Sequence, residues 1–63
     1  MIDQIYSMFA KYGFLCCPLS ERMIRHCISS GLNLNQVYSV GCDVHAGWRF
    51  RESLEAAMEG GEA

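Results

Sequence analysis

The fold predicted for this chain depends on one stretch, Val37-Tyr38-Ser39-Val40-Gly41-Cys42-Asp43-Val44-His45. Apolar residues alternate through it with small or polar ones, and a period of two is typical of a β-strand with one buried face. No other segment carries the pattern as clearly, and a lone strand cannot satisfy its own backbone hydrogen-bonding groups. The sequence therefore predicts that this strand pairs antiparallel with its copy near Val40 or Gly41, in an intertwined homodimer.

Two helices are expected ahead of the strand. Apolar residues recur at helical spacing over 1–12, and Gly13 supplies a C-terminal stop. In the next segment Ser20 is a suitable N-cap, and Gly31 is placed to close the helix in a Schellman motif. These signals predict a second helix over 21–30, reached through an apolar connector.

The segment after the strand is open to two interpretations. Apolar residues recur at i, i+4 and i+8 from Phe50, which favours a third helix over 48–58. Residues 48–51 also alternate, so they could instead return as the second strand of a hairpin. The predicted fold class is α+β, with two or three short helices and one strand per chain. The prediction is a single domain over 1–59, followed by a disordered tail over 60–63.

A chain of this length is expected to be only marginally stable as a monomer. For 7.1 kDa, folding should bury about 6,200 Å², whose apolar part contributes about 93 kcal/mol. Ordering 63 residues costs about 95 kcal/mol at ~1.5 kcal/mol per residue. Because the two sums nearly cancel, a metal, a disulfide or a second chain is expected to add stability.

Charge and hydropathy exclude several classes of protein. The net charge is −2, with only five Lys and Arg residues, so the chain lacks the basic footprint of a nucleic-acid binder. The N-terminus has no basic region followed by an apolar run, as a secretory signal would. No apolar stretch is long enough to span a membrane. We therefore expect an intracellular protein with neither a membrane nor a nucleic-acid partner.

The four cysteines and two histidines raise the question of zinc or nucleophilic catalysis. Cys42 and His45 have the spacing of half a zinc site, but no Cys-x-x-Cys pair completes it. A catalytic thiolate beside His45 would also need an orienting group on the same face. We therefore expect reduced, structural cysteines such as Cys27, with no metal, no cofactor and no enzymatic activity. A zinc-stabilised interaction domain is the third-ranked alternative.

A helix-turn-helix is the runner-up interpretation. In residues 22–37, Gly31 follows the small Cys27 by four positions, and Val37 and Val40 stand where a second helix would bury them. A recognition helix there would carry no Arg or Lys, which weakens the case for a DNA-binding regulator.

Two sets of residues are predicted to make contacts with other chains. The predicted dimer interface consists of Ile5, Phe9, Met23, Ile24, Ile28, Tyr38, Val40, Cys42 and Val44. The predicted hydrophobic groove, which would receive an amphipathic helix of a partner protein, consists of Met8, Tyr12, Phe14, Leu15, Trp48 and Phe50. Met58 would help the groove adapt to different ligands.

The chain as a whole resembles a family of small phage proteins. The resemblance rests on the 63-residue length, the Met1-Ile2-Asp3 start, the Cys16-Cys17-Pro18 elbow, the capped second helix and the stretch over 37–45. In these features the chain is similar to the early proteins from the exo–xis region of lambda-like temperate bacteriophages. The resemblance implies a non-enzymatic protein that favours lytic development through contacts with an unidentified host or phage protein in the host cytoplasm. No site residue carries over from it.

Overall fold

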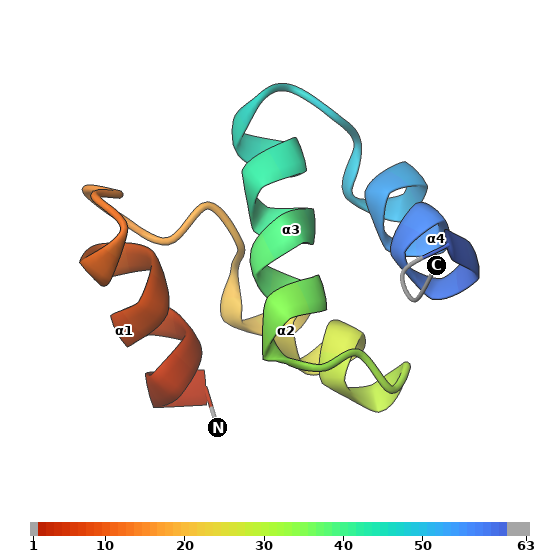
Figure 1. Cartoon of the computed structure of the whole chain (residues 1–63), viewed down its shortest axis with the longest axis horizontal. Helices are drawn as coiled ribbons and strands as arrows, with labels where there is room; N and C mark the ends of the chain where they lie inside the picture. The colour runs from red at the N-terminus through yellow and green to blue at the C-terminus, as the bar shows by residue number, and fades with distance from the viewer. Residues whose placement is uncertain (1, 61–63) are drawn as a thin grey trace.

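The chain folds as a helical bundle. The computed structural model describes residues 2–60, which form four helices: α1 (Ile2–Lys11), α2 (Glu21–Ser29), α3 (Leu34–His45) and α4 (Phe50–Gly60). α3 packs against each of the other three helices and stands between α1 and α4 in Figure 1. Residues 2–60 contain no strand, so the predicted α+β class is wrong.

The strand predicted over 37–45 lies inside α3. Asn33 and Gln36 start this helix with a capping box, in which each side chain accepts the other residue's backbone N–H at 2.9 Å. The buried positions of α3 then recur at helical spacing, at Val37, Val40 and Gly41. The cap and this spacing outweigh the alternation of period two, and the strand pairing between two chains has no basis.

The helices predicted ahead of this stretch are confirmed, with slightly shorter bounds. Ser20 caps α2 by accepting the Met23 N–H at 3.2 Å. Gly31 has φ +92°, and the Leu32 N–H donates to the Cys27 carbonyl at 3.1 Å, as a Schellman closure requires.

The segment after α3 is a helix, and the hairpin alternative is wrong. Gly47 has φ +108°, and the Trp48 N–H donates to the Asp43 carbonyl at 2.9 Å, which is a second Schellman closure. After that turn α4 begins at Phe50 and includes Gly60, the first residue of the predicted tail. Residues 61–63 lie outside the described part of the chain.

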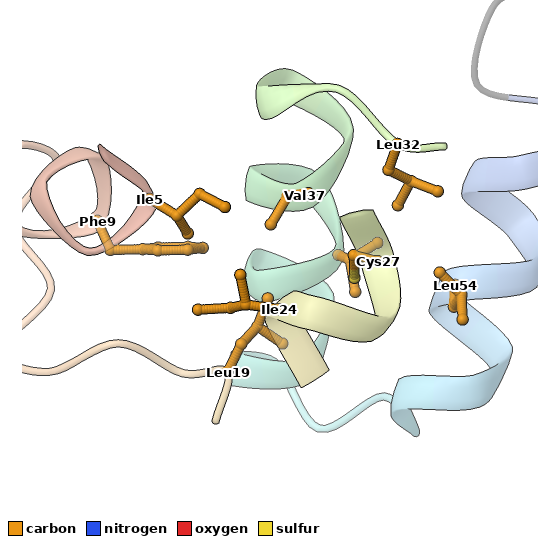
Figure 2. Close-up of a cluster of buried hydrophobic side chains, with 9 residues drawn as sticks. Ile5, Phe9, Leu19, Ile24, Cys27, Leu32, Val37 and Leu54 are labelled. Atoms are coloured by element: carbon orange, nitrogen blue, oxygen red, sulfur yellow. The ribbon is translucent and has the colours of Figure 1, made fainter. Parts of the chain in front are cut away.

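The four helices share one apolar core. Figure 2 shows Ile5 and Phe9 projecting from α1 toward α3, while Leu54 points from α4 toward Cys27 and Leu32. The buried apolar side chains are Ile5, Phe9, Leu19, Ile24, Cys27, Leu32, Val37, Val40 and Leu54.

Two side-chain hydrogen bonds within residues 2–60 fix α4 on α3. The Ser53 hydroxyl, only 1% exposed, donates to the Asp43 carboxylate at 2.8 Å. The Gln36 side-chain amide donates to the Ala57 carbonyl at 3.4 Å. With Ser53 and Ala57 held on α3, the adjacent face of α4, with Phe50, Leu54 and Met58, lines the space beside α2.

Candidate binding groove

An apolar groove of about 500 Å³ lies between α2 and α4, and each helix contributes one wall. α4 presents Phe50, Leu54 and Met58, which fall at i, i+4 and i+8 on one face. α2 presents Met23 and His26. We call this feature the α2–α4 groove.

The groove combines a fixed base with adaptable sides. Leu54 is 5% exposed and belongs to the core, so the packing around it holds its side chain in place. His26 packs edge-on against Phe50, with ring centroids 5.9 Å apart, and ties the two walls together. Met23 is half-buried and Met58 is 55% exposed. Unbranched methionines adjust to ligands of different shape, so this groove suits an apolar partner without a fixed outline.

The charges along the groove are predominantly positive. Arg22 lies on the α2 wall and Arg51 on the α4 wall, with Glu55 as the acidic residue of the lining. Arg25, one turn further along α2, already forms an ion pair with Glu21 at 2.6 Å. Acidic groups on a partner would therefore find a guanidinium on either side of the apolar strip.

The structure divides the predicted hydrophobic groove among four places. Tyr12, Phe14 and Leu15 come together beside the end of α1, and Phe50 lines the α2–α4 groove. Met8 lies on the outer face of α1, in a shallow hollow that Tyr12 also lines. Trp48 is 57% exposed in the turn between α3 and α4.

The predicted dimer-interface residues pack within one chain. Four of them are completely buried in the core: Ile5, Phe9, Ile24 and Val40. The others are half-buried: Met23, Ile28, Tyr38, Cys42 and Val44. The reason is that α3 replaces the strand, so the apolar face expected between two chains is covered by α1, α2 and α4.

The cysteines and histidines are dispersed. Within residues 2–60 no group of three or more His, Cys, Asp or Glu side chains is arranged to hold a metal ion. Burial raises the pKa of the Cys27 thiol to about 11, whereas Cys16 is exposed. The pKa of Tyr38 is also raised, first by a hydrogen bond with the Cys42 side chain and then by desolvation.

The helix-turn-helix alternative has a counterpart in the structure. α2 and α3 are joined by a four-residue turn, and Val37 and Val40 are buried at 1% and 0% exposure. However, α3 carries no Arg or Lys, and α1 and α4 pack along it. A recognition helix needs an open face with cationic or amide side chains that reach base edges, and this helix is a poor match.

Sequence reasoning found one wall of the α2–α4 groove and missed the other. The face of Phe50 and Met58 follows from helical spacing, whereas the sequence places Met23 in a predicted dimer interface. Arg22 and His26 were missed as groove residues, although their i, i+4 spacing places them on one side of α2.

None of the four helices is long and apolar enough to cross a membrane, over the residues that the structure describes. Comparisons with protein-family models, curated proteins and solved structures find no match to this chain.

Proposed function

We propose that this chain is a non-enzymatic protein-interaction module that holds the apolar face of an amphipathic helix in the α2–α4 groove. The observation that carries the proposal is an apolar strip between two helical walls with an arginine on each wall. Helix-in-groove recognition uses apolar anchors at i, i+3, i+4 and i+7, and the spacing of the α4 wall suits such a ligand.

The charged residues that line the groove favour one kind of amphipathic helix over another. Arg22 and Arg51 stand on opposite walls, whereas Glu55 is the one acidic residue that the described part of the chain adds to the lining. A helix with glutamates or aspartates beside its apolar face can pair with both arginines, while a basic helix meets like charges. The partner in this proposal is therefore an acidic amphipathic helix.

The cellular role in the proposal comes from the resemblance to early phage proteins. The partner helix would belong to a host or phage protein, and its capture would favour lytic development in the host cytoplasm. Expression of the chain in bacteria infected with a lambda-like phage should then lower the fraction of lysogens. A variant with a blocked groove, Met58→Glu, should lose this effect.

The groove can be tested directly by NMR of the methionine methyl groups. A synthetic helical peptide with leucines on one face and flanking glutamates should shift the signals of Met23 and Met58. Met8 is the internal control, because it lies on α1 outside the groove. Met58→Glu should weaken binding about tenfold or more while the fold is kept, since this side chain is 55% exposed.

The same titration distinguishes the alternatives. A peptide with lysines in place of glutamates should bind more weakly, and equal binding would contradict the role of the arginines. Equal shifts of Met8, or none at Met23 and Met58, would refute the groove. Specific binding of duplex DNA that Arg22→Ala together with Arg25→Ala abolishes would favour the DNA-binding alternative.

A further inference from the structure

The connector between α1 and α2 holds a leucine out in solvent. Leu15 is fully exposed in a connector whose two ends are anchored. The Phe14 N–H donates to the Phe9 carbonyl at 3.0 Å, and Leu19 at the far end of the connector is 2% exposed. Leu15 therefore projects into solvent from between two fixed points of the chain.

A hollow lies next to this leucine on the same surface. It measures about 500 Å³ and is lined by Tyr12, Gly13, Phe14, Leu15, Cys16, Pro18 and His45. Ring packing stiffens it, because Phe14 contacts the rings of Phe9, Tyr38 and His45 with centroids 5.2, 6.2 and 5.1 Å apart. We call this surface, with Leu15 and the hollow together, the aromatic face.

We propose that two copies of this chain associate through their aromatic faces, with Leu15 of each copy entering the hollow of the other. This inference goes beyond the proposed function, because it concerns a different surface and a different partner. A two-fold axis brings the same patch of both copies together, so the patch must supply both a projection and a recess. Leu15 and the hollow beside Phe14 meet that requirement.

The charges on the aromatic face also fit a second copy. Among residues 2–60, no Asp, Glu, Lys or Arg lines the hollow, so the described parts of two copies can meet without opposing like charges. A face without charge offers nothing to select an acidic or a basic partner, unlike the α2–α4 groove. Association would also cover Leu15 and Tyr12, which are 104% and 61% exposed, and so add apolar burial to a small core.

A dimer of this kind leaves the α2–α4 groove of each copy open. In Figure 1 the connector lies at the upper left, beside the end of α1, whereas α4 lies at the right. Two copies joined at the connector would therefore leave both grooves uncovered, because the groove and the hollow share no lining residue.

Sedimentation equilibrium over a range of concentrations tests the proposal with two matched variants. The wild-type chain should dimerise, and Leu15→Asp should weaken dimerisation about tenfold or more. Leu15→Asp should not disturb the monomer, because the side chain has no contacts to lose, and circular dichroism checks its helix content. Met58→Lys, on the other face, should dimerise as the wild type does.

Alkylation of Cys16 gives a second measurement on the same face. Its exposed thiol should react with iodoacetamide more slowly as the concentration of wild-type protein rises, and at one constant rate in Leu15→Asp. A wild-type chain that stays monomeric would overturn the proposal. A dimer that Met58→Lys disrupts and Leu15→Asp does not, or that neither change affects, would also overturn it.

Discussion

Cys27 lies in the core that the four helices share, and the pKa of its thiol reflects that burial. Its side chain has no exposed surface, and it lies beside Leu32 and Leu54 in Figure 2. Loss of water around the thiol raises its pKa from the ordinary 9.0 to about 11. The folded state therefore favours the neutral thiol more strongly than the unfolded chain does.

Cys27→Ser should lower the free energy of unfolding by about 1–3 kcal/mol at pH 7, because it places a hydroxyl among apolar side chains. Below pH 9 both states of the wild type carry the thiol proton, so its contribution is constant. Between pH 9 and about 11 the unfolded chain loses that proton first, so the wild type loses stability as pH rises. The difference between wild type and Cys27→Ser in urea titrations should therefore shrink across this range.

Cys16→Ser is the control for this prediction, because Cys16 is exposed. It should change stability by less than about 0.5 kcal/mol at any pH. A difference between wild type and Cys27→Ser that stays constant from pH 8 to pH 11 would contradict the assigned burial of the thiol.

At the scale of the elements, the contact of α1 with α3 depends on a glycine. Gly41 is buried in α3, and the ring of Phe9 lies directly over its α-carbon, where a methyl group would collide with it. Phe9 has no exposed surface and packs against the rings of Phe14 and Tyr38, so it has little room to move. The close approach of the two helices requires a residue without a side chain at this position.

Gly41→Ala should lower the free energy of unfolding by up to about 2 kcal/mol. Alanine improves helix propensity by about 1 kcal/mol, but overpacking against a fixed ring costs more, about 1–3 kcal/mol. A urea titration measures the change, and Ser39→Ala on the exposed side of α3 is the control. Adding Phe9→Leu to Gly41→Ala should cost less than Phe9→Leu does in the wild type. If Gly41→Ala stabilises the protein, the close contact is wrong.

α3 also shows why part of the fold could be predicted from sequence and part could not. The starts and ends of α1 and α2 follow from local signals such as Ser20 and Gly31, which act within one turn of the chain. In α3 two local signals conflict, because alternating valines favour a strand whereas Asn33 and Gln36 form a capping box. The capping box can be read from the sequence, whereas the burial of Val37, Val40 and Gly41 against the other helices appears only in the folded chain.

The candidate site was only partly predictable for the same reason. The spacing of apolar residues in the sequence predicts the apolar face of α4. The position of α4 opposite α2, however, depends on the turn at Gly47 and on the hydrogen bond between Ser53 and Asp43. Both features became visible only in the folded chain. The pairing of Met23 with Met58 across a groove could therefore not be derived from the sequence.

At the scale of the whole molecule, one core connects helices at opposite sides of the bundle. α1 and α4 each pack mainly on α3 and not on each other. The nine buried apolar side chains of residues 2–60 nevertheless form a single cluster from Ile5 in α1 to Leu54 in α4. A chain of this size has no second core that could stay folded if one end opened.

Leu54→Ala should therefore destabilise α1 and α3 equally, although it lies in α4. Truncation of a buried leucine lowers the free energy of unfolding by about 2–4 kcal/mol. If the bundle unfolds as a single cooperative unit, all four helices lose that stability together. Hydrogen exchange measured by NMR should accelerate by the same factor for the slowest amides of α1 and of α3. Met58→Ala, whose side chain is 55% exposed, should leave both rates nearly unchanged. Faster exchange confined to α4 and the adjoining part of α3 would show instead that α1 and α2 remain folded when α4 detaches.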